Sequence, residues 1–260
     1  MATWQDLDRE LEAWLAAGRT ATLWWRDDDA TQPTPALARL LALAARFGQP
    51  LHLAVIPAQL ETGVAGLLAG RPEVRVLQHG YAHIDHIASA GQGAAELGPG
   101  RPKAVLCGEL AEGWRRLAAA GLPRLLPVLV PPWNRIASEV VAWLPGLGYR
   151  GLCTFGGRAG PEAAPGLLQV DSHCDPIRWK GGPRFCGLEA ALEVLVGHLS
   201  ARRSGRVDAN EPSGILTHHL ETDEATWAFM EELLARTAGR PGARWIGLET
   251  LLQPAGDIHV

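Results

Sequence analysis

The stretch LWWRDDDA at residues 23–30 decides the fold of this chain. The apolar residues at its start are typical of a buried strand, and the run Asp27, Asp28 and Asp29 closes it. A strand alternates its side chains between two faces, so three adjacent carboxylates at one strand end diverge and repel one another. A bound cation, or a division of roles between the carboxylates, would offset that repulsion. The alternative is a polar loop whose aspartates cap the next helix.

The rest of the chain alternates predicted strands with predicted helices. The further strands are expected at 51–57, 74–80, 125–135, 151–157, 167–175 and 214–220. The helices are expected at 3–18, 34–48, 61–70, 106–121, 137–148, 188–203 and 224–237, with loops at 89–104 and 179–187 and a short element at 244–253. This alternation predicts a single α/β domain over 1–260, with about seven parallel strands and the helix 3–18 packed on it. No glycine-rich nucleotide motif follows the first strand, so a distorted (β/α) barrel is favoured over an open doubly wound sheet.

Composition excludes several classes of protein. A net charge of -4 over 260 residues argues against nucleic-acid and anionic-membrane binding. The first residues lack the basic segment and apolar core of a secretory signal, and no apolar run reaches the ~20 residues that span a bilayer. The four cysteines form no CxxC pair and fit reduced thiols. We therefore expect a cytoplasmic protein; its oligomeric state is left open.

A histidine cluster follows the predicted strand 74–80. The segment QHGYAHIDH holds His79, His83 and His86. Two histidines four residues apart can converge on one metal from a helical turn or from a tight bend after a strand. A divalent ion held by two imidazoles and one carboxylate keeps positions open for water, which zinc and related first-row ions accept. The alternative for a single histidine here is a hydrogen-bonded packing residue.

The order and placement of these clusters resemble the polysaccharide deacetylases with the NodB-like fold, carbohydrate esterase family four. The first motif of that family, TFDDG, resembles RDDDA at 26–30. The resemblance implies that Asp28 is the catalytic base and Asp29 a metal ligand.

The second family motif, H[ST]xxH, resembles HGYAH at 79–83. It implies that His79 and His83 are the other two ligands of one divalent ion, with Gly80 in place of the hydroxyl residue. Zinc is the first expectation for this ion, and cobalt, nickel and manganese are the alternatives.

The fifth family motif, LxH at the end of an apolar strand, resembles Leu216-Thr217-His218. It implies that His218 is the general acid. His219 is the rival, because successive strand residues face opposite ways and only one of the two can point into a site. The residues alone leave this choice open, and the family match favours His218.

The two middle motifs depart from the family pattern. VPPWNR at 130–135 resembles the third motif, RxP with an aromatic residue, but Val130 stands where the arginine that orients the base is usually found. Either Arg135 or Arg26 is the expected substitute.

DSHCDPIRW at 171–179 loosely resembles the fourth motif, with Asp171, Asp175 and Trp179 expected to line the substrate groove or tune a histidine. The full set of residues expected to contact substrate or to support the catalytic groups is Asp27, Tyr81, Pro132, Trp133, Asn134, Arg135, Asp175, Trp179 and His219. The remaining histidines, His52, His173, His198 and His259, are expected to be structural or at the surface.

The resemblance implies a metal-dependent hydrolase of C–N bonds other than peptide bonds, in which metal-activated water, an aspartate base and a histidine acid remove an acyl group, expected to be acetyl. The expected partner is a small N-acylated sugar or another small amide. One rival is a non-catalytic carbohydrate-binding or regulatory domain on the same fold, supported by the missing arginine. A second rival is a hydrolase of another bond, such as an ester.

Overall fold

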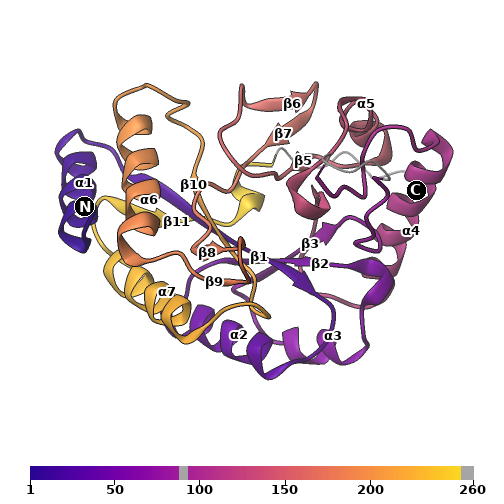
Figure 1. Cartoon of the computed structure of the whole chain (residues 1–260), viewed down its shortest axis with the longest axis horizontal. Coiled ribbons are helices and arrows are strands. Elements are labelled where there is room, and N and C mark those ends of the chain that lie inside the picture. The colour runs from indigo at the N-terminus through magenta and orange to yellow at the C-terminus, as the bar shows by residue number, and fades with distance from the viewer. Residues whose placement is uncertain (88–92, 253–260) are drawn as a thin grey trace.

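The computed structural model describes residues 1–87 and 93–252, and its elements surround one sheet (Figure 1). Neighbouring strands follow the order β10-β1-β2-β3-β4-β5-β7-β6, and β11 pairs with β1. Every pairing in this sheet is parallel except that of β6 with β7. The strands are β1 (Ala21–Ala30), β2 (Leu51–Val55), β3 (Val74–His79), β4 (Leu125–Val130), β5 (Gly151–Leu152), β6 (Glu162–Ala164), β7 (Leu167–Gln169), β10 (Ser213–Thr217) and β11 (Ala243–Trp245).

The two ends of the sheet approach each other through the segment that follows β7. Ser172 forms a parallel bridge with Phe155, just after β5, and Cys174 forms one with Ile215 of β10. The N–H of Leu216 donates to the carbonyl of Cys174 at 2.8 Å. These isolated bridges connect the segment after β7 to both β10 and the segment after β5, where the described residues form no continuous strand pairing. The predicted α/β fold with a mainly parallel sheet is confirmed.

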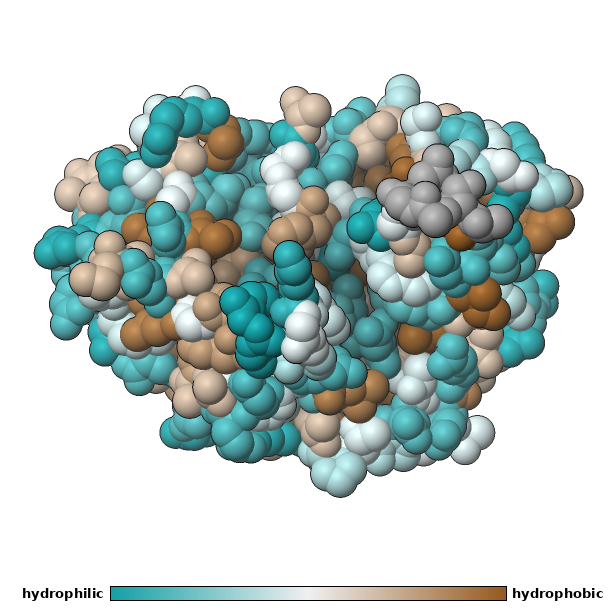
Figure 2. All heavy atoms as spheres, in the orientation of Figure 1, coloured by the Kyte–Doolittle hydropathy of each residue, from teal (hydrophilic) through white to brown (hydrophobic). Residues whose placement is uncertain are grey.

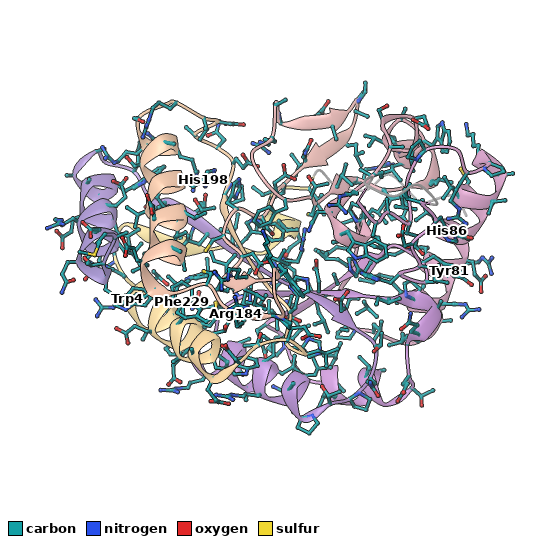
Figure 3. All side chains as sticks on the ribbon, in the orientation of Figure 1. Trp4, Tyr81, His86, Arg184, His198 and Phe229 are labelled. Atoms are coloured by element: carbon teal, nitrogen blue, oxygen red, sulfur yellow. The ribbon has the colours of Figure 1, made fainter. Side chains whose placement is uncertain are left out.

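Helices cover the outside of the sheet, as Figure 1 shows. They are α1 (Trp4–Ala16), α2 (Pro35–Phe47), α3 (Gly63–Leu68), α4 (Lys103–Ala119), α5 (Ser138–Val141), α6 (Leu188–Arg203) and α7 (Glu224–Thr237), with 3-10 turns η1 (Pro57–Gln59), η2 (Pro132–Asn134), η3 (Leu144–Leu147) and η4 (Leu248–Thr250). The N-terminal helix α1 packs along α6, where Trp14 Nε1 donates to the carbonyl of Leu199 at 3.2 Å. Its first residues also reach α7, where Trp4 stacks on Phe229 with ring centroids 5.4 Å apart (Figure 3). Asp8 of α1 pairs with Arg236 and Arg240 beside this contact.

Strand β1 separates two apolar clusters. Leu23 and Trp25 belong to the cluster under the helices, whereas Trp24 packs with Ala54 and Leu77 inside the curve of the sheet. This division follows from the alternation of side chains along a strand. Because β1 is buried on both faces, the same alternation sends the side chains of Asp27 and Asp28 at its end to opposite faces.

Several predicted boundaries differ from the structure. The strands expected at 151–157 and 167–175 are cut to Gly151–Leu152 and Leu167–Gln169, because the chain after each turns into loop carrying polar groups. The loop expected at 179–187 contains part of a hairpin, β8 (Ile177–Arg178) with β9 (Arg184–Phe185), whose apolar residues pair on one face. The helix expected at 137–148 is interrupted between α5 and η3, because Pro145 within η3 has no N–H to donate to the carbonyl one helical turn earlier.

Some predictions cannot be placed. His259 and residues 88–92 of the expected loop 89–104 lie outside the described residues. Within the described residues, no helix is both long and apolar enough to cross a membrane.

One buried histidine ties the sheet to the C-terminal segment. Nδ1 of His52 lies 2.8 Å from the carbonyl of Trp25, and its Nε2 accepts the N–H of Leu248 at 2.9 Å. Burial lowers the pKa of His52 from 6.5 to about 4. Between these two pH values the unfolded chain binds a proton that the folded chain does not, so stability falls as the pH falls.

This linkage predicts that the free energy of unfolding decreases between pH 6.5 and pH 4, with His52 contributing on the order of 2–3 kcal/mol. Denaturant unfolding at pH 7 and pH 4 should show a smaller decrease for His52→Asn than for the wild type. His86→Asn, at an exposed histidine, is the control. If the free energy of unfolding fell by the same amount between pH 7 and pH 4 in His52→Asn and in His86→Asn, the assignment to His52 would be wrong.

Candidate active site

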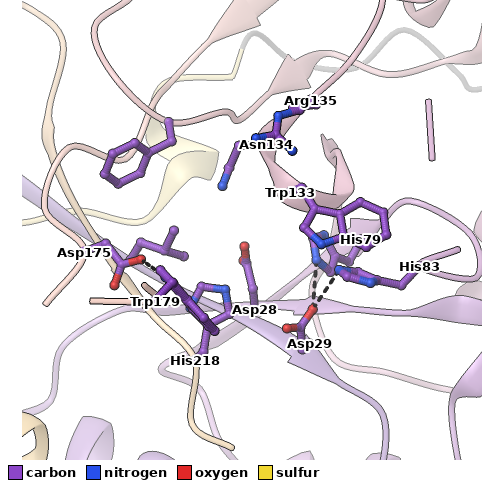
Figure 4. Close-up of a pocket in the computed structure, with 12 residues that line it drawn as sticks. Asp28, Asp29, His79, His83, Trp133, Asn134, Arg135, Asp175, Trp179 and His218 are labelled. Carbon is purple, nitrogen blue, oxygen red and sulfur yellow. Dashed lines mark hydrogen bonds and ion pairs between the residues drawn. The ribbon is translucent and has the colours of Figure 1, made fainter. Parts of the chain in front are cut away.

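A pocket of about 640 Å³ lies at the carboxyl ends of the parallel strands (Figure 4). In the space-filling view the face drawn in Figure 2 is hollowed near its centre, beside the β8–β9 hairpin. The pocket is lined by Asp28, Asp29, His79, His83, Trp133, Asn134, Arg135, Phe155, Asp175, Trp179, Leu216 and His218. Ten of these twelve were expected from the sequence as catalytic, metal-binding or supporting residues, and the other two are Phe155 and Leu216.

The three aspartates are divided between the two faces of β1. Asp27 is fully buried away from the pocket, accepting from Thr217 Oγ1 at 2.6 Å and lying 2.5 Å from His219 Nδ1. Asp28 points the other way and lines the pocket. Strict alternation would return Asp29 to the face of Asp27, but its φ of 70°, in the irregular pairing of β1 with β2, turns it into the pocket as well.

Asp29, His79 and His83 form a group that could hold a metal ion, with ligand atoms within 4.8 Å of one another. Asp29 Oδ1 lies 3.1 Å from His79 Nε2 and 3.4 Å from His83 Nε2 (Figure 4). His79 Nδ1 is 2.9 Å from the carbonyl of Val130. A carbonyl accepts only from an N–H, so in the neutral imidazole this contact leaves the Nε2 lone pair free for a metal. The donor set therefore fits a divalent first-row ion.

The charge state of Asp29 agrees with such a role. Burial raises the pKa of Asp29, but the hydrogen bond from His79 and the charges of the surrounding histidines outweigh it and hold that pKa well below its usual range. Burial, followed by the charge of His79, lowers the pKa of His83. The group thus favours an ionised Asp29 and a neutral His83, the forms that bind metal. Although burial lowers the pKa of His79, Asp28 and Asp29 raise it, so a metal would displace a proton from His79 Nε2.

The turn that carries His83 is held by a buried glutamate. Glu96 is 1 % exposed and accepts the N–H groups of Tyr81 at 3.0 Å, Ala82 at 2.7 Å and His83 at 3.1 Å. Sequence reasoning missed this residue. The available signal was that Glu96 is the only charged residue in 87–100, a stretch otherwise of small, apolar and amide residues.

Arg26 takes the position beside Asp28. Its Nη2 donates to Asp28 Oδ2 at 3.1 Å and to Asn134 Oδ1 at 2.6 Å, and its Nε lies 2.9 Å from Asp28 Oδ1 without hydrogen-bond alignment. Arg26 is fully buried, so its positive charge attracts the negative charge of Asp28 strongly in this medium of low polarity. Arg135 instead donates to the carbonyl of Ala94 at 2.9 Å. Of the two alternatives, the structure brings Arg26 to Asp28.

The two adjacent histidines after β10 face opposite ways. His218 lines the pocket, and its Nδ1 has no hydrogen-bond partner among the described residues. His219 is buried against Asp27 on the other side of the strand. Although burial lowers the pKa of His219, Asp27 raises it and the net shift is upward.

Asp175 and Trp179 form one wall of the pocket. Trp179 Nε1 donates to Asp175 Oδ2 at 2.8 Å, and the Trp179 ring packs edge-on against His218 with centroids 4.7 Å apart. Asp175 thus holds the tryptophan that contacts His218. On the opposite wall the ring of Trp133 lies 4.2 Å from that of His83.

Other residues expected near the site lie elsewhere. The Tyr81 side chain is outside the pocket lining and lies against Arg116, toward the right of Figure 3. Pro132 is buried behind the pocket rather than lining it. Asp171 accepts from Thr154 and is likewise outside the pocket lining.

A second group of possible metal ligands, with atoms within 4.8 Å of one another, is formed by His173, His198 and Glu211. However, His173 Nδ1 accepts the N–H of Gly214 at 3.0 Å. In a neutral imidazole with its lone pair so used, Nε2 carries the hydrogen and cannot bind a metal. His173 stacks on His198 at 3.5 Å between centroids and faces Glu211, which makes the group a packing cluster, as the sequence predicted for both histidines.

Comparison with known proteins yields no match to a family model and none to a curated protein. Solved structures do match over nearly the whole chain. A polysaccharide deacetylase described as putative, from Mycobacterium smegmatis, superposes with a TM-score of 0.63 at 15% identity, covering 92% of this chain and 94% of the other. The chain has the NodB-like fold of the polysaccharide deacetylases. The fold implied by the sequence motifs is confirmed.

Two further structures support this conclusion. The family 4 carbohydrate esterase from Streptomyces lividans, in complex with acetate, gives a TM-score of 0.54 at 16% identity, with 92% and 98% of the two chains covered. A family 4 acetyl xylan esterase from Clostridium thermocellum, in complex with a cobalt ion, gives 0.50 at 10% identity, with 88% and 89% covered. At these identities the NodB-like fold is shared, while the chemistry must be argued from the pocket itself.

Proposed function

We propose that this protein is a metal-dependent deacylase that hydrolyses an N-acyl group, expected to be acetyl, on a small amino sugar or related amide. The observation that carries the proposal is the placement of three different groups around one pocket: the Asp29–His79–His83 donor set, the Arg26–Asp28 pair and His218. Two solved relatives in fold are described as complexes with acetate and with a cobalt ion. Their contents agree with an acyl hydrolase that uses a divalent ion.

A divalent ion at the donor set would lower the pKa of water and polarise the acyl carbonyl. Asp28 takes a proton from the attacking water, whose oxygen bonds to the acyl carbon. Arg26 keeps the Asp28 carboxylate oriented toward the pocket while Asn134 braces the guanidinium. His218 protonates the nitrogen as the C–N bond breaks, which releases a carboxylic acid and a free amine.

The pocket supports a small, sugar-like substrate. Phe155 and Trp179 are each 45% exposed and line it, offering flat apolar faces on which a sugar ring can stack. The pocket volume of about 640 Å³ is also within the ordinary range for sites that bind small molecules.

The alternative of a non-catalytic carbohydrate-binding domain rested on the missing arginine of the third motif. Because Arg26 supplies a guanidinium to Asp28 from the first motif, that argument loses its support. Acetate release from a panel of N-acetylated sugars and small amides, with an O-acetyl ester beside them, would separate deacylase, esterase and binding domain. No release from any compound by the metal-loaded protein would contradict the proposal.

Removing either histidine ligand should abolish metal binding while the fold remains. We expect His79→Ala and His83→Ala to lose the single equivalent of zinc that the reloaded wild type retains, measured by elemental analysis after gel filtration, with unchanged far-ultraviolet circular dichroism. His86→Ala is the control, because His86 is exposed in the same segment and outside the pocket lining (Figure 3). Equal stoichiometry in all four proteins would show that the ligands are assigned wrongly.

A further inference from the structure

Glu96 occupies an unusual position for a glutamate, and the proposed metal-dependent function does not account for it. We propose that Glu96 is a positioning residue for the metal site, which fixes the backbone of His83 so that its imidazole meets Asp29 and His79. The inference rests on the proposed function, because it concerns the ligand geometry of that same site.

The hydrogen bonds of Glu96 are concentrated on one turn. Oε1 accepts the N–H groups of Ala82 and His83, and Oε2 accepts that of Tyr81. Three successive N–H groups that converge on one carboxylate form a closed turn with little freedom to rotate. Both oxygens of the side chain are used, so neither can be exchanged for a donor without leaving a backbone N–H unpaired.

The conformation of the turn requires such support. His83 has a φ of 57°, which a residue with a β-carbon rarely adopts, and Gly80 has a φ of 53°. A β-carbon at residue 80 would collide with Glu96 Oε2 and lie 2.6 Å from Pro132 Cδ. The turn therefore needs both a glycine at 80 and a fixed acceptor to hold His83 in its left-handed conformation.

The backbone around Glu96 is itself anchored at three points. Ala137 donates its N–H to the carbonyl of Leu97 at 2.9 Å, just after β4 and η2. Arg101 Nη1 donates to the carbonyl of Glu96 at 3.2 Å, and the N–H of Ala95 donates to Asp85 Oδ1 at 3.0 Å. The carboxylate thus connects the ligand turn to a loop that Leu97 ties to the segment after β4, through Ala137 and a parallel bridge with Ile136.

Residues that orient metal ligands without touching the metal typically contribute 10- to 100-fold to affinity. We therefore expect Glu96→Gln to raise the Kd for Zn²⁺ by about 10- to 100-fold, measured by competition with a chromophoric chelator. The visible absorption of the Co²⁺-substituted protein should change in shape as well, because the side-chain NH2 of the glutamine would face the Tyr81 N–H and the turn that carries His83 would shift.

Asp85→Asn is the matched control. It also neutralises a carboxylate of this loop, but Asp85 accepts the N–H groups of Ile87 and Ala95 with Oδ1 alone, so an asparagine keeps both bonds. We expect it to leave the Kd and the Co²⁺ spectrum unchanged. An unchanged Kd in Glu96→Gln, or an equal increase in both variants, would overturn the inference.

Two further outcomes are distinguishable. If Glu96→Gln does not fold, the same titration is made with Glu96→Asp, and failure of both to fold would make Glu96 a folding residue and overturn the inference. A wild-type protein that binds no Zn²⁺ would overturn the proposed metal site together with this inference. A wild type that binds Zn²⁺ as tightly as Glu96→Gln would overturn only the role of Glu96.

Discussion

Asp28→Asn is expected to keep the metal and to lose about 100-fold or more in turnover, the contribution that general-base catalysis typically makes. Asparagine has the shape of aspartate, and Arg26, itself held by Asn134, can keep its oxygen in place, but an amide does not accept a proton from water. Asp28 itself is outside the donor group formed by Asp29, His79 and His83. Metal content should therefore be unaffected, as measured by elemental analysis beside the rate of acetate release.

The neighbouring aspartates provide the controls for this prediction. Asp29→Asn should lose metal affinity as well as turnover, since Asp29 Oδ1 lies 3.1 Å from His79 Nε2. Asp27→Asn should act mainly on stability, because Asp27 is buried against His219 and Thr217 on the far face of β1. If Asp28→Asn lost the metal and Asp27→Asn lost only turnover, the roles would shift by one residue along the strand.

His218→Ala should reduce turnover far more for an amide than for an ester with a good leaving group. An amine leaves poorly unless its nitrogen is protonated, whereas a phenolate of low pKa needs little protonation. The ratio of the two rate losses, from kcat/KM on an N-acetyl substrate and on an aryl acetate, isolates the acid from any effect on binding or metal. Equal losses on both substrates would mean that His218 binds or orients instead of donating a proton.

His219→Ala is the matched control, because His219 is the adjacent residue of the same strand end. It faces Asp27 inside the protein and should show no dependence on the leaving group. Its effect should appear in thermal stability, since Ala leaves the buried Asp27 carboxylate without its imidazole partner. A leaving-group-dependent loss for His219→Ala would transfer the role of acid to that residue.

Long amphipathic helices and buried strands were the parts of the fold most accessible to sequence reasoning. The helices expected at 188–203 and 224–237 have the observed bounds of α6 and α7, because apolar residues recur at the helical period between clear breaks. Short pieces were missed. β6, and the hairpin of β8 with β9, are two or three residues long, too short for a period to show, and their pairing depends on neighbours brought up by the fold.

The sequence by itself determined the order of strands and helices and the residue types of the candidate site. RDDDA, HGYAH and LTH each follow an apolar segment that the sequence predicts to be a buried strand, so their polar groups were expected to gather at one edge of a parallel sheet. Spacing of four residues between His79 and His83 then pointed to a shared metal.

Only the tertiary structure decided which of the adjacent aspartates and which of the two candidate arginines belong to the site. Alternation along β1 separated Asp27 from Asp28, and a left-handed φ at Asp29, which no local pattern specifies, returned that residue to the pocket. The choice of Arg26 over Arg135, and the reach of Glu96 to the turn before His83, depend on contacts between segments far apart in the chain. The physical reason is the low polarity of the protein interior, where burying a carboxylate without a partner costs a large free energy. Which partner each buried charge contacts is therefore fixed only when the helices pack against the sheet.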